Sequence, residues 1–114
     1  TYGRDVYFET SPVKRFPLTP LNLYDIIGNV WEYCSDFYSS SYYAESEQHD
    51  PRGPEEGEYR VMRGGSWDNS KWNCRAAVRG RRLPSVTYGD TGFRIVISSD
   101  AVAVPAPPGT EKKK

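Results

Sequence analysis

Two carboxylates bracket a glycine turn in the pattern Asp25-x-x-Gly28-x-Val30-x-Glu32. Calcium prefers about six to eight oxygen ligands, and a tight glycine-containing loop can aim carboxylates and backbone carbonyls at one ion. The spacing is equally compatible with structural roles, in which Asp25 caps a turn and Glu32 pairs with an arginine. The segment is therefore a candidate calcium loop with a structural alternative.

The chain has two cysteines, Cys34 and Cys74, and neither belongs to a Cys-x-x-Cys pair. Their spacing therefore does not indicate a zinc site or a dithiol redox site. They can form one disulfide or serve as two buried, small apolar residues. We expect neighbouring thiols in the core and leave the bond itself open.

A single histidine, His49, lies beside Asp50 in an acidic stretch. No nucleophile or partner base is spaced with it in a catalytic pattern. We therefore expect a solvent-exposed loop histidine.

The overall charge is balanced, since fifteen basic and fifteen acidic residues cancel. No net field would attract the chain to nucleic acid or to an anionic membrane. No apolar run approaches the ~20 residues of a membrane-spanning helix. We expect neither a nucleic-acid partner nor a membrane span.

A chain of 114 residues has room for one domain, to which we assign residues 1–98. Residues 99–114 are rich in proline and end in three lysines. Such a segment cannot bury enough apolar surface to offset its ordering entropy, so we expect a disordered tail.

Regular structure is expected to be short, because ten glycines and nine prolines interrupt the chain. The apolar spacing allows one short helix, near Tyr42–Glu47. Short runs rich in β-branched and aromatic residues predict strands at Asn29–Phe37, Tyr59–Gly64, Cys74–Arg79 and Gly92–Ser98. Large aromatic side chains are expected to supply the core, namely Tyr24, Trp31, Trp67, Trp72 and Phe93.

Four motifs follow one another along the chain: Leu23–Asp36, Gly64-Gly65-Ser66-Trp67, Asn73–Arg79 and Gly92-Phe93-Arg94. Over about residues 2–98 they resemble the C-terminal half of the formylglycine-generating-enzyme (sulfatase-modifying-factor) family. The resemblance implies an α+β, loop-rich, C-type-lectin-like domain with short antiparallel strands and little helix. Family members normally carry a further upstream half. Three alternatives therefore stay open: the chain is a fragment that an upstream segment completes, a minimal version of the fold, or a chain whose fold a partner chain completes.

The resemblance assigns ligands to the candidate calcium loop. In the family, this loop binds calcium through the side chains at the positions of Asp25 and Glu32 and the carbonyls at those of Gly28 and Val30. All four positions are chemically competent in this chain. Calcium is therefore the expected metal.

The resemblance also bears on catalysis. The family's oxidase members bind copper(I) through a pair of cysteines just after the Gly-Gly-Ser motif, since soft thiolates suit that metal. In this chain Trp67–Asn73 contains no cysteine, and Asn69 stands at about the first expected position. Cys74 belongs to the following Cys-Arg-Ala-Ala motif, and one thiol cannot replace two. Copper is not an expected cofactor.

Ligand-binding members of this fold, including variable proteins diversified by retroelements, display exposed side chains between the Gly-Gly-Ser-Trp and Gly-Phe-Arg motifs. Trp, Tyr and Arg carry much of the binding energy at protein interfaces. The candidate ligand-binding residues here are Asp68, Asn69, Lys71, Trp72, Arg81, Arg82, Tyr88 and Asp90. Alternatively, Trp72 and Leu83 complete the core and the arginines are merely solvated.

Two pairs of arginines are expected to differ in role. Arg75 and Arg94 lie in strand motifs, where a guanidinium can satisfy carbonyls or a carboxylate, and are predicted to hold the fold. Arg81 and Arg82 lie in a loop and are predicted to contribute little to stability.

These patterns favour a non-catalytic module that recognises a protein or another ligand on a calcium-stabilised scaffold. Two alternatives remain. The first is an oxygen- and copper-dependent oxidoreductase that generates formylglycine from a protein cysteine, with thiols supplied by another segment or chain. The second is a structural domain of a larger protein.

Overall fold

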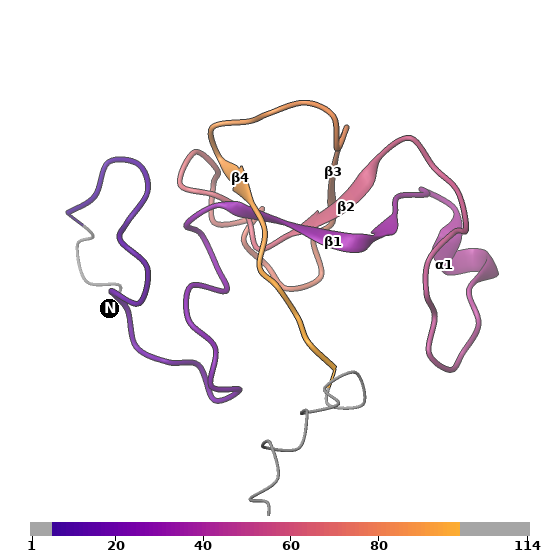
Figure 1. Ribbon diagram of the computed structural model, residues 1–114, viewed down its shortest axis with the longest axis horizontal. Helices are drawn as coiled ribbons and strands as arrows, with labels where there is room; N and C mark the ends of the chain where they lie inside the picture. Colours follow the sequence, from indigo (N-terminus) through magenta and orange to yellow (C-terminus); the bar gives the residue numbers. More distant parts are fainter. Residues whose placement is uncertain (1–5, 99–114) are drawn as a thin grey trace, which may run out of the picture.

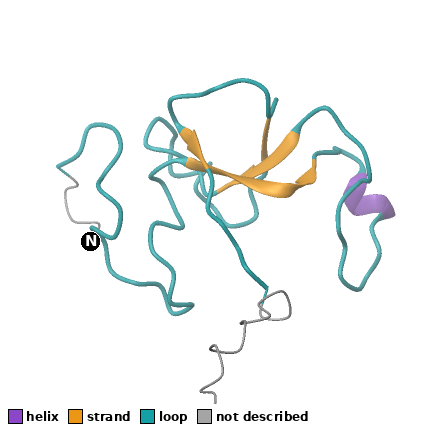
Figure 2. Cartoon of the chain, viewed as in Figure 1, coloured by secondary structure: helices purple, strands orange, loops and turns teal. Residues whose placement is uncertain are grey.

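The computed structural model describes residues 6–98, in which one small sheet is flanked by long loops (Figures 1 and 2). Its strands are β1 (Trp31–Phe37), β2 (Arg60–Arg63), β3 (Gly80–Arg82) and β4 (Thr91–Gly92). A short helix, α1 (Tyr42–Glu45), follows β1. The sheet order is β3-β2-β1-β4, which places the two longest strands at its centre.

The strand pairings mix two orientations. β1 pairs antiparallel with β2, with Glu32 opposite Arg63, and a bulge interrupts the register between Tyr33 and Phe37. β2 pairs antiparallel with β3. β4 lies parallel to β1. The expectation of antiparallel strands therefore holds for two pairings, and the edge strand β4 is the exception.

The core is small and lies on β1 and β2. Trp31, Val61 and Met62 are 6%, 1% and 3% exposed. Gly80 on β3 allows a close approach, because an added Cβ would lie 3.0 Å from the end of Met62 and 3.3 Å from the Trp31 ring. Trp31 confirms the expectation of an aromatic core residue at that position.

A tight turn of two glycines leaves β2. Gly64 and Gly65 both have positive φ, at 96° and 70°. A Cβ at Gly64 would lie 2.8 Å from the Ile26 carbonyl oxygen, and one at Gly65 would lie 2.6 Å from Cys74 Sγ. Only glycine fits both the backbone conformation and the space. The turn therefore packs the loop around Cys74 and the loop around Ile26 against the end of β2.

Residues 6–30 form loops without helix or strand, and these lie toward one end of the sheet while α1 lies toward the other (Figure 1). Hydrogen bonds between side chains and backbone hold them. The Ser11 N–H donates to Asn29 Oδ1 (3.0 Å), and the Lys14 N–H donates to Asp25 Oδ2 (2.8 Å). The loops are thereby tied to the residues that lead into β1.

Several expected elements differ in the structure. The strand expected at Cys74–Arg79 is wrong: this segment forms turns, in which the Val78 N–H donates to the Arg75 carbonyl, and the strand β3 begins at Gly80. The strand expected at Gly92–Ser98 is replaced by the short β4, because the chain leaves β1 after Gly92. The helix ends at Glu45 rather than Glu47. The tail expected at 99–114 lies outside the described residues.

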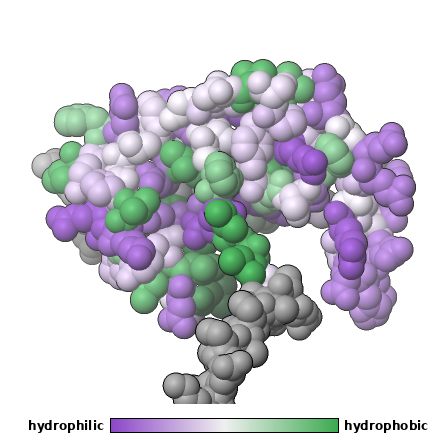
Figure 3. All heavy atoms as spheres, viewed as in Figure 1, coloured by the Kyte–Doolittle hydropathy of each residue, from purple (hydrophilic) through white to green (hydrophobic). Residues whose placement is uncertain are grey.

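The aromatic core is also smaller than expected. Trp67, Trp72 and Phe93 are 37%, 66% and 76% exposed, and Tyr24 is half-buried. The short sheet offers too little surface within residues 6–98 to cover these side chains. Hydrophobic side chains accordingly reach the surface, as Figure 3 shows for the segment that continues from β4. No helix in this described range is long and apolar enough to cross a membrane.

Candidate functional site

The candidate calcium loop is organised around Arg94. Its Nε donates to Glu32 Oε2 (2.7 Å), and its Nη2 donates to Glu32 Oε1. The same guanidinium donates to the carbonyls of Tyr24 (3.1 Å) and Asp25 (3.3 Å). The hydrogen bonds to Glu32 raise the pKa of Arg94 above its ordinary value. The structure thus places Glu32 in an ion pair with an arginine. This is the structural role that the sequence offered as the alternative to calcium binding.

Asp25 is only partly satisfied. It has a positive φ of 53°, and its Oδ2 accepts the hydrogen bond from Lys14. Its Oδ1 is buried and has no hydrogen-bond partner in the structure. Gly28 also has a positive φ, of 91°, and its N–H donates to the Gly64 carbonyl (3.0 Å). The loop is therefore held in place on both sides of the unpartnered oxygen.

Few side-chain oxygen atoms in this loop are available to bind calcium. The buried Asp25 Oδ1 is an available ligand, and each Glu32 oxygen keeps a lone pair beyond its bond to Arg94. Residues 6–98 contain no group of three or more His, Cys, Asp or Glu side chains that could hold a metal. A calcium ion here would therefore need backbone carbonyls, such as those of Gly28 and Val30, as well as both acids.

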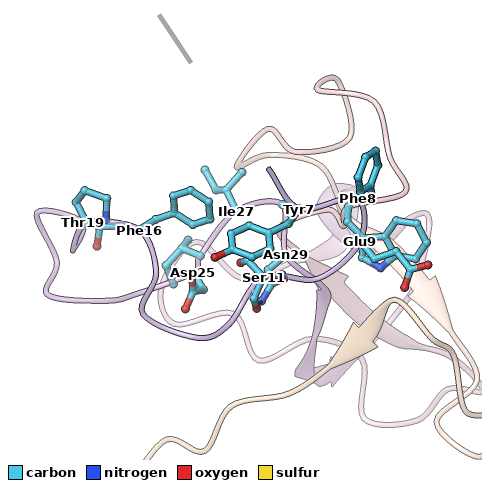
Figure 4. A pocket seen from close by; sticks show the side chains of 13 residues that line it. Tyr7, Phe8, Glu9, Ser11, Phe16, Thr19, Asp25, Ile27 and Asn29 are labelled. Carbon is cyan, nitrogen blue, oxygen red and sulfur yellow. Dashed lines mark hydrogen bonds between the residues drawn. The ribbon is translucent and has the colours of Figure 1, made fainter. Parts of the chain in front are cut away.

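A cavity of about 530 Å³ adjoins this loop. Apolar side chains from the N-terminal loops and from the entry to β1 line much of it, with Asp25, Ser11 and Asn29 among its polar residues (Figure 4). Trp67 contributes from the loop after β2, and the Trp67 N–H donates to the Asn29 carbonyl (3.1 Å). Asp25 therefore belongs both to the candidate calcium loop and to the wall of this cavity.

A second polar network links the two segments that carry the candidate ligand-binding residues. Ser66 is 2% exposed, and its Oγ lies 2.9 Å from Asn69 Oδ1 and 3.1 Å from Asp90 Oδ2. Arg82 donates to both carboxylate oxygens of Asp90 and to Thr91 Oγ1 (2.6 Å). The hydrogen bond from Arg82 is the main cause that lowers the pKa of Asp90. Asp90 therefore stays ionised and braces both segments.

Arg82 is not the loosely held loop residue that the sequence predicted. It lies on β3, pairs with Asp90 and places its guanidinium 4.2 Å from the ring centre of Tyr88. Arg75, predicted to hold the fold, is exposed and donates from Nε to the neighbouring Trp72 carbonyl (3.0 Å). The prediction for Arg94 agrees with its contacts. The contacts of Arg75 and Arg82 are the reverse of those expected, since Arg82 rather than Arg75 pairs with a carboxylate.

The candidate ligand-binding residues fall into two groups. Side chains alternate along a strand. Arg82 contacts Tyr88 and Asp90, whereas the Arg81 guanidinium lies 5.1 Å from the ring centre of Tyr38 and 5.4 Å from that of Tyr59. The structure therefore brings Asn69, Arg82, Tyr88 and Asp90 together and sets Arg81 apart.

Of the exposed members, Arg81 lies on β3 and the others lie in the turns after Trp67. Asp68, Lys71 and Trp72 are exposed, and the Lys71 ammonium lies 5.4 Å from the Trp72 ring centre. Trp72 therefore does not complete the core, contrary to the alternative in which Trp72 and Leu83 both do so. Leu83 is half-buried. Asn69 turns inward onto Ser66 and serves the network that holds this loop.

Sequence reasoning missed Arg63. Its Nη1 donates to the carbonyls of Ala76 (3.0 Å) and Val78 (3.3 Å), and its Nη2 donates to the Tyr43 hydroxyl (3.2 Å). This arginine ties β2 to the turns at 74–79 and to α1. A basic residue at the end of a short strand was the only signal, and many exposed arginines share it.

The remaining side chains with reactive groups are two cysteines and one histidine. Cys34 and Cys74 are free and half-buried, so neither lies in the core. Burial, with a smaller effect of Asp36, raises the pKa of the Cys34 thiol, which lowers the fraction of reactive thiolate at neutral pH. His49 is exposed, as expected.

Short strands, long ordered loops and one short helix are the features of the C-type-lectin-like class. The Sulfatase-modifying factor enzyme 1-like domain matches residues 1–99, and the chain belongs to this family. The formylglycine-generating enzyme of Streptomyces coelicolor is 41% identical over 101 residues, which are 86% of this chain and 32% of that protein. The serine/threonine-protein kinase pkn1 of Chlamydia caviae is 44% identical over 88 residues, which are 75% of this chain and 14% of that protein.

Solved structures show the same fold. Variable protein 1 of Treponema denticola has a TM-score of 0.65 and 35% identity, and the match covers 81% of this chain and 33% of that one. PvdO of Pseudomonas aeruginosa has a TM-score of 0.69 and 32% identity, with coverage of 82% and 36%. This chain thus spans about a third or less of the length of these proteins. The fold expected from the sequence motifs is confirmed.

Proposed function

We propose that the chain acts as a non-catalytic recognition module, which presents the turns at 68–72 and the loop at 83–90 to a protein or another ligand. The observation that carries this proposal is the network of Ser66, Asn69, Arg82 and Asp90 beneath the two segments. Exposed side chains on braced loops lose little conformational entropy on binding, which is the condition for a preorganised binding surface.

The chemistry of the exposed side chains supports the same role. Trp72 is 66% exposed, and Lys71, Asp68 and the half-buried Tyr88 accompany it on the two segments. A large exposed aromatic residue with charged neighbours is typical of an interface anchor. The similarity to a protein named for its variability, variable protein 1, is a further reason to assign recognition to this fold.

Calcium is part of the proposal as a stabiliser of the scaffold. Asp25 would supply its buried Oδ1, Glu32 a carboxylate oxygen, and Gly28 and Val30 their carbonyls. The unpartnered Oδ1 supports this assignment, because a buried anionic oxygen without a donor is costly. Glu32 would share its carboxylate between the metal and Arg94.

A formylglycine-generating oxidoreductase is the second candidate, and the 41% identity to an enzyme of that name favours it. That chemistry would need a pair of copper-binding thiols, while Trp67–Asn73 contains no cysteine. Conversion of a cysteine-containing sulfatase peptide by this chain, above the level of a Cys74→Ser variant, would establish the enzyme and displace the recognition module.

Binders selected from a phage-displayed peptide library provide the direct test of recognition. The proposal expects most binders to lose affinity for a Lys71→Ala, Trp72→Ala, Tyr88→Ala variant. They should still bind a control variant in which the exposed Glu55 and Glu56 are replaced by alanine. Binders that are insensitive to the first variant would contradict the assigned face.

A further inference from the structure

Three arginines beside α1 have no carboxylate partner in the described part of the chain. Arg63, Arg79 and Arg81 form no ion pair within residues 6–98. Arg82 and Arg94, by contrast, each pair with an acid. Cations that lie near one another without a counter-charge repel, and an oxyanion is the group that best relieves this repulsion at a guanidinium.

Tyrosine rings bring two of these cations together. The Arg79 guanidinium lies 5.0 Å from the ring centre of Tyr38 and 4.1 Å from that of Tyr43. The Arg81 guanidinium lies 5.1 Å from the ring centre of Tyr38 and 5.4 Å from that of Tyr59. Both charges therefore lie at the same Tyr38 ring. These five residues, Tyr38, Tyr43, Tyr59, Arg79 and Arg81, form what we call the arginine–tyrosine face.

Hydrogen bonds fix the tyrosines that carry this face. The Tyr38 N–H donates to the Tyr59 carbonyl (2.8 Å), which joins the end of β1 to the start of β2. Arg63 Nη2 donates to the Tyr43 hydroxyl (3.2 Å) and thereby holds α1 against β2. Because the rings are held in this way, the stacked guanidinium groups are placed before any ligand binds.

The two arginines present their donors on the same side of the chain. They are two residues apart, and side chains alternate along an extended segment, so both point away from the side taken by Arg82. Arg79 uses Nη2 for the Ser39 carbonyl (3.3 Å), and Arg81 donates to no acceptor within residues 6–98. With tyrosine rings on the guanidinium faces, the open N–H groups lie at the edges, where a carboxylate can accept two parallel hydrogen bonds.

The surroundings of the face favour a short anion over a long one. Glu45 ends α1 and Glu58 precedes Tyr59, and neither acid pairs with an arginine of the face. A polyanion that extends beyond the face would be repelled by these acids. Two or three neighbouring carboxylates are enough to neutralise Arg79 and Arg81, so a short acidic peptide segment is the ligand whose charge is complementary.

The position of the face favours a partner over a preceding part of the same polypeptide. Residues 6–30, through which any upstream segment would join, lie toward one end of the sheet, and α1 lies toward the other (Figure 1). None of the ring contacts of Arg79 or Arg81 involves residues 6–30.

We propose that the arginine–tyrosine face binds a short acidic segment of a protein partner, with Arg79 and Arg81 each donating edge N–H groups to a carboxylate. This surface is separate from the one assigned to recognition at 68–72 and 83–90, because Arg81 points away from Tyr88 and Asp90. The proposal therefore stands or fails independently of that assignment.

Fluorescence anisotropy of labelled hexaglutamate, titrated with the full chain at about 50 mM salt, tests the proposal. The wild type should bind hexaglutamate and leave labelled hexaglutamine free. Arg81→Gln should raise the Kd about fivefold, the effect of losing one partly exposed ion pair, and Arg81→Lys should give an intermediate value. Arg15→Gln removes the same charge from an exposed position in the loops at 6–30 and should bind like the wild type.

Several results would overturn the proposal. Wild-type chain at about 500 μM that leaves the peptide free would do so, since even weak complexes are populated there. Equal Kd values for Arg81→Gln and Arg15→Gln, in chains with unchanged circular dichroism spectra, would show that binding depends on overall charge. Tighter binding of an oligothymidylate than of hexaglutamate would assign the face to nucleic acid.

A form of the protein that carries the upstream half is the final arm of the test. It should bind hexaglutamate as tightly as the 114-residue chain does. Loss of binding in the longer form alone would show that the upstream half itself covers Arg79 and Arg81, and would overturn the assignment to a separate partner.

Discussion

Arg94 holds Glu32 through two side-chain hydrogen bonds across 62 residues of sequence. The same guanidinium donates to the carbonyls of Tyr24 and Asp25. One side chain therefore joins the segment after β4 to β1 and to the loop that precedes β1. The arginine of the Gly-Phe-Arg motif therefore holds together the two ends of the candidate calcium loop, at Asp25 and Glu32.

Replacing Arg94 by alanine should lower the free energy of unfolding by about 1–3 kcal/mol. Exposed ion pairs contribute about 0–1 kcal/mol and broken buried pairs cost about 3–5 kcal/mol. The Arg94 and Glu32 side chains are 33% and 23% exposed, which places this pair between the two cases. Urea denaturation measures the loss. Arg75→Ala, with one local hydrogen bond, should change stability by less than about 0.5 kcal/mol, and an equal loss at both positions would contradict the assignment.

Asp90 should make the stability depend on pH. Its folded pKa is lowered, mainly by the hydrogen bond from Arg82, so its contribution is fully present above the unfolded value of about 3.9. The contribution is lost as pH falls through the lower folded pKa. Unfolding free energies between pH 5 and the most acidic pH at which the chain still folds should therefore drop more steeply for the wild type than for Asp90→Asn. Parallel pH profiles would show that the pair with Arg82 does not stabilise the fold.

The Gly64-Gly65 turn should tolerate no side chain. Gly65→Ala combines a φ of 70° with a Cβ placed 2.6 Å from Cys74 Sγ and 3.1 Å from its Cα. We expect a loss of about 2–4 kcal/mol from backbone strain and overpacking together. Gly89→Ala is the control, because nothing lies within 4 Å of its added Cβ. Differential scanning calorimetry should show a large fall in Tm for the first variant and little change for the second.

Calcium should stabilise the chain through Asp25. At a concentration about 100-fold above its Kd, a ligand that binds only the folded state adds about 2.7 kcal/mol. Thermal unfolding in calcium and in chelator should therefore differ for the wild type. Asp25→Asn should remove most of that difference, while Asp68→Asn, at an exposed carboxylate, should keep it. Identical wild-type melting curves in calcium and chelator would rule out the metal.

The sequence predicted the central strands because their patterns are strong and local. The run that contains Trp31 and the run that contains Val61 are both rich in β-branched and aromatic residues, and both form strands with buried side chains. The segment at 74–79 has a similar composition, yet it forms turns. Arg63 donates hydrogen bonds to two of its carbonyls, and Gly65 packs closely against Cys74, so contacts between residues distant in sequence hold the segment. Propensity does not reveal contacts of that kind.

The sequence indicated which residues belong to the candidate site better than it indicated which of them contact each other. The sequence pointed to Asp25, Glu32 and Arg94, and the structure brings all three together. It did not reveal that Arg82, rather than Arg75, is held by a carboxylate, because the partner Asp90 lies in another loop. Phe93 was expected in the core because it is a large hydrophobic residue. It is exposed because the pairing of β4 with β1 ends at Gly92, which leaves no neighbouring strand to cover its side chain within the described residues.

A hydrogen-exchange footprint of the chain with a selected peptide binder tests the recognition face most directly. The account predicts slower exchange at 68–72 and 83–90, the segments above the Ser66, Asn69, Arg82 and Asp90 network. The loop at 42–58 should exchange at the same rate with and without the peptide. Protection confined to 42–58, with none between 68 and 90, would contradict the assigned function.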